Sequence, residues 1–214
     1  MSNDQGLDKK TGGGNTVSGN GGSVSSGRRG TARQRMVGAF WDLFKEIGIK
    51  NVTVSAITKK AGVHRSTFYE YFDDVYDLLD AVEQEFIDEI SANADRVIDS
   101  LEIVTLEAYL REIALIIPQY MDRGLQLIGA NGDPAMRPRL LHAMKSKLSR
   151  VSGIPADYKY LDLVAEIVFS SVFTGMSYYM DHPDRLTYEE LTEILQKTMR
   201  AVVASVSPEG HTST

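Results

Sequence analysis

The stretch TVSAITKKAGVHRSTFYEYF, residues 53–72, predicts two short helices joined by a tight turn. Thr53 is suited to cap the first helix, because its hydroxyl can accept a hydrogen bond from a free amide of the first turn. Gly62 is suited to end it, since glycine adopts the left-handed conformation without strain. Apolar residues repeat between them on one helical face: Val54, Ile57 and Ala61.

The second helix of this stretch is expected from about His64. Phe68 and Phe72 lie four positions apart, which places both on the core face. Ser66 and Tyr69 then fall on the opposite side. In helix-turn-helix proteins the N-terminal end of the second helix enters the major groove of DNA. The stretch therefore predicts a DNA-binding motif.

The run T-V-x-x-I-x-x-x-A-G-V-x-x-x-T-F-Y-x-Y-F resembles the DNA-binding domain of the TetR family of bacterial transcriptional regulators. The similarity covers about residues 31–82. That family usually places a phosphate-binding lysine three residues after the final phenylalanine, where this chain has Val75. The resemblance implies an all-α fold, with an N-terminal three-helix helix-turn-helix domain followed by an α-helical dimerisation and effector domain.

The motif and the resemblance together imply a set of DNA-binding residues. Arg65 is predicted to read a guanine, because a guanidinium can bond both major-groove acceptors of that base; the alternative is that it binds a phosphate or lies in solvent. Tyr69 and Tyr71 match family positions that contact the backbone or a thymine. Lys60 is expected to serve a phosphate. The full predicted set is Thr53, Ser55, Lys60, His64, Arg65, Ser66, Thr67, Tyr69 and Tyr71.

The distribution of charge supports a DNA-binding role, although the net charge of the 214-residue chain is −6. Residues 28–72 hold nine Lys or Arg and three Asp or Glu, a balance of +6. Residues 73–214 hold 12 basic and 24 acidic residues, a balance of −12. A basic region on an acidic molecule orients it towards phosphate. The alternative is an ordinary mixed surface.

The N-terminal segment differs in composition from the rest. Residues 1–30 hold nine of the chain's 18 glycines and scarcely any bulky apolar side chain, which predicts disorder. Arg28 and Arg29 at its end are candidates for a minor-groove arm, the alternative being a solvated tail. The expected division is a tail at 1–30, a DNA-binding domain at 31–75, a helical dimerisation and ligand-binding domain at 76–206, and a flexible C-terminus at 207–214.

Several other functions find no support in the sequence. The chain has no cysteine, which rules out disulfides and thiolate metal sites. Its four histidines lack metal-ligand spacing, and neither a nucleophile elbow nor a glycine-rich phosphate loop is present. We therefore expect no enzyme activity, metal or cofactor. Without an apolar run near ~20 residues or a signal peptide, a cytoplasmic protein with no membrane partner is predicted.

Charged side chains are expected to form solvated faces on two of the later helices. One long helix from about Asp73 to Leu101 links the two predicted domains, and its acidic run reads Glu83, Glu85, Asp88 and Glu89. A helix from Asp133 to Arg150 carries five basic residues. A second nucleic-acid site on that helix is the alternative.

The last two helices, about 157–180 and 187–206, are more apolar than one protomer can cover, which predicts a homodimer with Gly175 as a candidate for its seam. A two-fold dimer predicts a near-palindromic operator. Aromatic and thioether side chains on the helices of the second domain suit a small apolar effector, or equally a plain core. The candidate ligand-binding residues are Tyr109, Tyr120, Met144, Phe169 and Phe173.

The sequence thus predicts a homodimeric transcriptional regulator that binds operator DNA. A repressor released by an effector is the first hypothesis, because a protein on a promoter readily blocks polymerase. An activator or coactivator of the same fold is the alternative. A helical module that binds a protein partner and no longer binds DNA is a further one, favoured by Val75 and the acids beside it.

Overall fold

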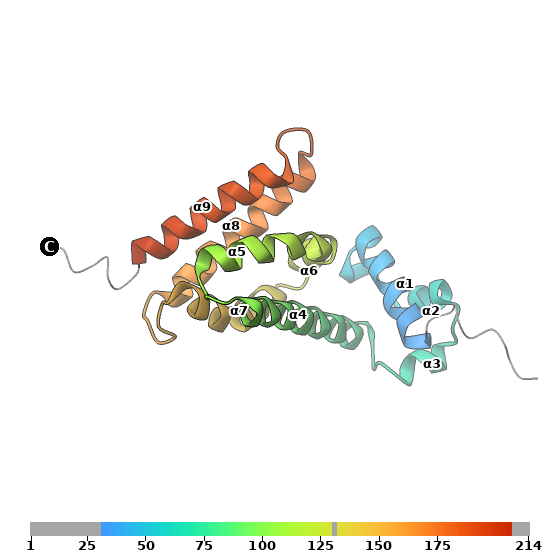
Figure 1. Ribbon diagram of the computed structural model, residues 1–214. Helices are drawn as coiled ribbons and strands as arrows, with labels where there is room; N and C mark the ends of the chain where they lie inside the picture. The colour runs from blue at the N-terminus through green and yellow to red at the C-terminus, as the bar shows by residue number, and fades with distance from the viewer. Residues whose placement is uncertain (1–30, 130–131, 207–214) are drawn as a thin grey trace, which may run out of the picture. The chain divides into compact units, whose positions relative to one another are not determined.

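The computed structural model describes residues 31–129 and 132–206, which form helices joined by short loops, with no strand in either range (Figure 1). The predicted all-α fold is confirmed. The proposed tail with Arg28 and Arg29 and the proposed flexible C-terminus lie outside the described residues. The α-helices are α1 Ala32–Ile47, α2 Val54–Ala61, α3 Arg65–Tyr69, α4 Val75–Ser100, α5 Leu106–Ile116, α6 Met121–Ile128, α7 Met136–Ser152, α8 Leu161–Asp181 and α9 Tyr188–Val206, and short 3₁₀ helices occupy Ile49–Asn51 and Ile117–Tyr120.

Helices α1 to α3 fold around a small aromatic and aliphatic core. Phe40, Ile57 and Phe68, one from each helix, are completely buried. As predicted, Thr53 caps α2 by accepting a hydrogen bond of 3.2 Å from the Ala56 amide. Gly62 ends α2 in the left-handed conformation, with φ of 64°. These local signals place α3 directly after a sharp turn, as a helix-turn-helix requires.

Helix α4 belongs to two cores. Asp74 caps it by accepting hydrogen bonds from the amides of Tyr76 and Asp77, at 2.7 and 2.9 Å. Its first half packs with the α1–α3 core through Leu78, Leu79 and Val82. Its second half packs through Ala94 and Ile98 with residues of α5, α7, α8 and α9. One continuous helix therefore connects the helix-turn-helix to the helices that follow.

Two helices begin later than the sequence predicts. Before α7, Asp133 accepts a hydrogen bond of 2.9 Å from the Ala135 amide, so a turn replaces the predicted first residues of the helix. A side chain at Gly132 would place its Cβ 1.9 Å from the Leu127 carbonyl oxygen, and glycine is therefore needed there. Before α8, hydrogen-bonded turns occupy the segment after Pro155, and the helix begins at Leu161.

Helices α8 and α9 lie side by side as an antiparallel pair (Figure 1). A Cβ at Gly175 would lie 3.1 Å from both the Leu191 Cδ1 and the Leu195 Cδ2 atoms of α9. Gly175 therefore allows close packing within one protomer, and its place at a seam between protomers stays a prediction. The lack of a side chain serves the approach of α8 to α9 of the same chain.

Candidate DNA-binding surface and effector cavity

The predicted DNA-binding residues lie on α2, α3 and the segments that flank them. All nine are exposed except Thr67, which is half-buried. Phe68 and Phe72 point the other way and are 0% and 4% exposed. Burial of Phe68 on α3 and of Phe72 just after it fixes the orientation of α3. The side chains of Arg65, Ser66 and Tyr69 are then left at the surface. This arrangement is what a recognition helix needs.

Arg65 and Tyr69 form a pair on the exposed side of α3. The Arg65 Nη2 and Nε atoms donate hydrogen bonds of 2.9 and 3.3 Å to the Tyr69 hydroxyl. The guanidinium carbon lies 5.6 Å from the centre of the Tyr69 ring, within the range of a cation–π contact. Tyr69 thus holds the guanidinium in one orientation at the surface of α3.

Lys60, predicted to serve a phosphate, is engaged by acidic residues of α1. Its Nζ lies 3.3 Å from an Asp42 carboxylate oxygen and 3.4 Å from a Glu46 carboxylate oxygen. A phosphate contact by Lys60 would therefore exchange these surface ion pairs for a new one. Solvent screens exposed pairs of this kind and they contribute little to stability, so the exchange costs little free energy.

The departure from the TetR pattern at Val75 has a structural reason. Val75 is 8% exposed and belongs to the core of the helix-turn-helix. The acids before it are used locally, since Asp74 caps α4 and the Asp73 amide donates to Asp77 at 2.9 Å. Tyr76, the next residue, is 60% exposed at the same end of α4.

A cavity of about 250 Å³ lies among α4 to α9 and is lined almost wholly by apolar side chains. All five candidate ligand-binding residues contribute to its wall: Tyr109, Tyr120, Met144, Phe169 and Phe173. Burial raises the pKa of Tyr109 to about 12, with the charge of Asp95 adding to the effect. The Phe169 and Phe173 rings stack with centres 6.5 Å apart.

The wall also contains residues that sequence reasoning did not select. Phe86, Ile90 and Asn93 of α4 line the cavity at helical spacing. The Asn93 side-chain amide donates to the Tyr120 hydroxyl and, at 3.0 Å, to the Glu89 carbonyl. Lys147 of α7 lies at the wall and pairs with Asp95 at 2.9 Å. The helical spacing of Phe86, Ile90 and Asn93 was the sequence signal for this part of the wall. The same spacing is equally typical of residues in an ordinary hydrophobic core.

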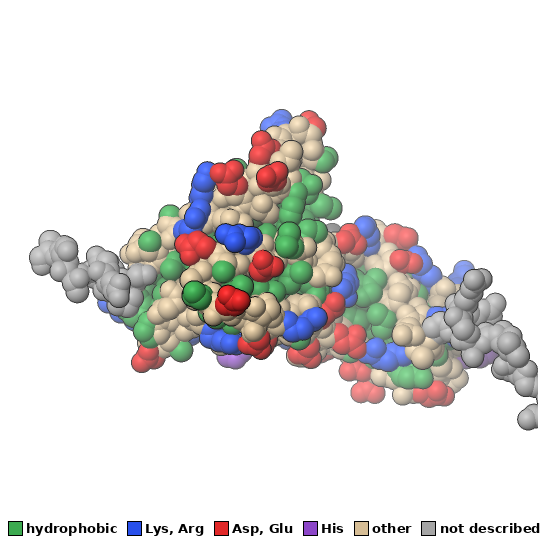
Figure 2. Space-filling view, viewed as in Figure 1, with side chains coloured by type: hydrophobic (Ala, Val, Ile, Leu, Met, Phe, Trp, Pro, Cys, Tyr) green, Lys and Arg blue, Asp and Glu red, His purple; other side chains and the backbone are tan. Residues whose placement is uncertain are grey.

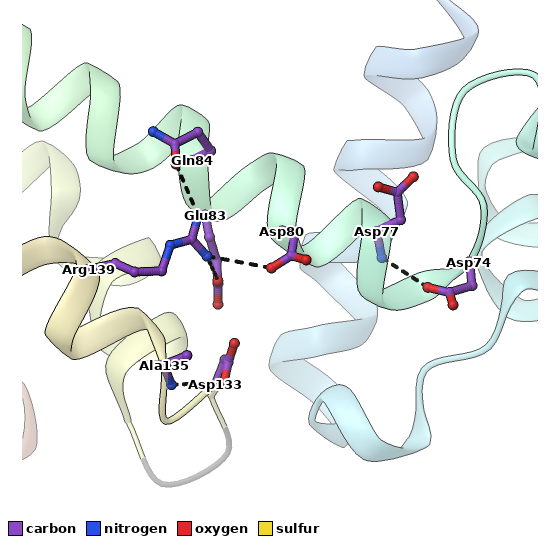
Figure 3. Close-up of polar contacts among 8 residues, drawn as sticks. All are labelled: Asp74, Asp77, Asp80, Glu83, Gln84, Asp133, Ala135 and Arg139. Carbon is purple, nitrogen blue, oxygen red and sulfur yellow. Dashed lines mark hydrogen bonds and ion pairs between the residues drawn. The ribbon is translucent and has the colours of Figure 1, made fainter.

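Glu83 contradicts the expectation that the acidic run of α4 is solvated, because its side chain is completely buried. Its Oε2 accepts a hydrogen bond of 2.7 Å from Arg139 of α7, whereas its Oε1 accepts none (Figure 3). Burial raises the pKa of Glu83 to about 7, and the charges of Asp133 and Asp80 act in the same direction while Arg139 opposes them.

The five basic residues of α7 are partly exposed, and all of them form ion pairs. Each of them pairs with an acid of α4 or α8, at 2.5 to 3.1 Å for the closest partner. Arg137, for example, lies 2.8 Å from Glu166 of α8, and Arg150 lies 3.1 Å from Asp99 of α4. These side chains hold α7 against its neighbours, which disfavours a second nucleic-acid site on this helix.

Helices α8 and α9 leave hydrophobic side chains at the surface, and Figure 2 shows such side chains along their hairpin. Leu163 and Ile167 of α8 are 55% and 38% exposed, and Ile194 of α9 is 56% exposed. Contrary to the expectation from sequence, α8 is long and apolar enough to cross a membrane by length and composition. One such helix is weak evidence for a span, and 17% of its apolar window is buried.

A buried three-helix core that presents an exposed, partly basic helix after a sharp turn defines a helix-turn-helix DNA-binding protein. Residues 39–82 match the model of the bacterial regulatory proteins of the tetR family. That match and the fold described above identify residues 39–82 as a TetR-type helix-turn-helix DNA-binding domain.

Solved structures of the family have a similar fold. A putative TetR-family regulator from Syntrophomonas wolfei superposes with a TM-score of 0.64 at 17% identity, covering 83% of this chain and 97% of the other. SCO4454 of Streptomyces coelicolor gives 0.57 at 21%, covering 82% and 96%. FadR of Bacillus subtilis in complex with stearoyl-CoA gives 0.56 at 18%, covering 81% and 98%. No curated protein sequence matches the chain.

Proposed function

We propose that this regulator binds a near-palindromic operator as a homodimer, represses transcription there, and is released by a small apolar effector. The observation that carries the proposal is α3, whose Arg65 and Tyr69 are exposed while Phe68 is buried in the core. Such a protein acts where the chromosome is, so we propose a cytoplasmic location. An activator would use the same surfaces, and operator position relative to the promoter separates the two.

The proposed dimer uses the exposed apolar face of α8 and α9. Side chains such as Leu163 and Ile194 are more than half exposed in the protomer, and a two-fold partner would remove them from water. The same symmetry would present two copies of α3 to successive major grooves, about 34 Å or a multiple apart. Dimerisation and a near-palindromic operator are therefore one proposal.

The proposed effector site is the cavity among α4 to α9. Its apolar wall favours a small molecule that is mostly hydrocarbon, with Asn93, Tyr120 and Lys147 as the polar groups near it. The FadR relative, solved with stearoyl-CoA, makes an acyl chain a suitable first ligand to test. Since Phe86 and Ile90 line the cavity from α4, a ligand there would contact the helix that leads to the helix-turn-helix.

The experiment is to select bound sequences from random DNA and to measure affinity for the site and its single-base variants at several salt concentrations. Arg65→Ala is expected to cost roughly 1–3 kcal/mol and to relax preference at one base pair per half-site. Lys60→Ala is expected to weaken all sequences alike and to lower the salt slope by about one. If no sequence is enriched and binding is absent at low salt, the protein-interaction alternative replaces this proposal.

A further inference from the structure

Three carboxylates from two separate segments lie close together beside Arg139 (Figure 3). Asp80 and Glu83 come from α4, and Asp133 comes from the turn before α7. One oxygen of each lies within 4.8 Å of the other two. We call these three residues the acidic cluster. Like charges at such separations repel one another unless a cation lies between them.

A second observation points to a ligand of this cluster. Glu83 is completely buried, yet its Oε1 accepts no hydrogen bond from the described part of the chain. A buried, unpaired carboxylate oxygen is costly, and native proteins rarely leave one without a partner. Arg139 satisfies the other oxygen, Oε2, from 2.7 Å. The remaining oxygen has no partner among residues 31–129 and 132–206, and it is available to a bound cation.

The charge balance defines what that group must be. The ionised cluster carries three negative charges and Arg139 carries one positive charge, so two negative charges remain. The Asp80 side chain is 68% exposed, which leaves the cluster an opening to solvent. Carboxylate oxygens without histidine or cysteine favour hard divalent cations over zinc or copper.

We propose that the acidic cluster is a binding site for a divalent cation that prefers oxygen ligands, such as Ca²⁺, Mn²⁺ or Mg²⁺. Calcium–oxygen distances are about 2.3–2.6 Å, so two ligands on opposite sides of the ion lie roughly 4.6–5.2 Å apart. The three carboxylate oxygens lie within 4.8 Å of one another, close enough to contact one common ion. Mg²⁺ and Mn²⁺ have shorter bonds, and the ligands would close slightly around them.

The turn before α7 holds Asp133 ready for this role. Gly132 is required by its contact with the Leu127 carbonyl, and the Asp133 Oδ1 is fixed by the Ala135 amide. The second carboxylate oxygen of Asp133 is left for the cation. A cation bound here would tie α4 to the start of α7 through charge rather than through apolar packing.

The test uses the full chain and Mn²⁺ alone, with free Mn²⁺ measured by electron paramagnetic resonance. The wild-type protein is expected to bind one Mn²⁺ per chain, and Ca²⁺ or Mg²⁺ should displace it. Asp80→Asn, Asp133→Asn and Glu83→Gln should each weaken binding at least tenfold. Asparagine caps helices about as well as aspartate, so Asp133→Asn removes charge and keeps the turn.

Asp99→Asn is the matched control, because Asp99 is also on α4, is also 68% exposed and also pairs with an arginine of α7. It should leave Mn²⁺ affinity unchanged. Helix content measured by circular dichroism identifies a variant that fails to fold. If Glu83→Gln fails to fold, Asp80→Asn still tests the site, because Asp80 is at an exposed position. The proposal is overturned if the wild type binds no Mn²⁺ saturably, or if Asp80→Asn and Asp133→Asn bind as tightly as Asp99→Asn.

Discussion

Leu163→Glu is expected to break the proposed dimer. Leu163 of α8 is 55% exposed in the protomer, so the partner would bury about half of the side chain. Full burial of a leucine contributes about 1.5–3 kcal/mol, which gives roughly 1 kcal/mol for the exposed half. Two-fold symmetry places both copies at the interface and doubles the loss to about 2 kcal/mol, or roughly 30-fold in dissociation constant. Two buried glutamates add a further cost.

The assay is sedimentation velocity over a range of protein concentrations. Ile103→Glu is the control, because Ile103 is 75% exposed on the loop between α4 and α5 and undergoes the same loss of apolar surface and gain of charge. It should dimerise like the wild type. The reasoning fails if Leu163→Glu leaves the dissociation constant unchanged, if Ile103→Glu disrupts the dimer equally, or if the wild type is a monomer at micromolar concentration.

Three further predictions follow from single contacts. Gly175→Leu should lower the free energy of unfolding by about 1–3 kcal/mol through overpacking against α9, whereas Gly38→Ala, with nothing near the new Cβ, should raise it by about 0.5–1 kcal/mol; thermal denaturation measures both. Asp42→Asn releases one partner of Lys60, so operator affinity should rise a few-fold with a steeper salt slope in fluorescence anisotropy, and an unchanged slope contradicts this. In cation-free buffer the Glu83 pKa of about 7, set by burial, the rest of the acidic cluster and Arg139, exceeds its ordinary 4.5. This group therefore contributes stability that is full below pH 4.5 and is lost as pH rises through 7, roughly 3 kcal/mol relative to Glu83→Gln, and urea unfolding at pH 5 and 8 tests that loss.

Much of the fold could be predicted because its signals are local. Thr53, Gly62 and Asp74 act on amides or backbone angles within a few residues, and each does in the structure what its residue type indicates. The apolar period of α1 gives its bounds without knowledge of its neighbours. Where helices α7 and α8 start later than expected, the reason is also local, since turns compete with the first helical turn at Asp133 and after Pro155.

The electrostatic part of the structure could not be predicted, because its partners are far apart in the sequence. Glu83 and Arg139 are 56 positions apart. The spacing of Glu83 from Leu79 and Phe86 places it on the apolar face of α4, but the sequence does not show which cation would meet it there. Lys60 is engaged by Asp42 and Glu46 of another helix. Pairing of this kind depends on how helices pack, which a one-dimensional charge pattern does not record.

Two of the three proposed sites have residues on α4, and the N-terminal end of this helix adjoins the third. Within 20 residues this helix carries the Asp74 cap beside the helix-turn-helix, Glu83 of the acidic cluster, and Asn93 of the cavity wall. A ligand at either of the last two changes operator affinity only if it binds one orientation of α4 better than another. Linkage then makes the effect reciprocal, with a typical factor of about 5–150. If Mn²⁺ alters operator affinity by some factor, a saturating operator must alter Mn²⁺ affinity by the same factor, and titrations in both orders measure it. Equal Mn²⁺ affinity with and without DNA would show that the acidic cluster stabilises α4 and α7 without regulating DNA binding.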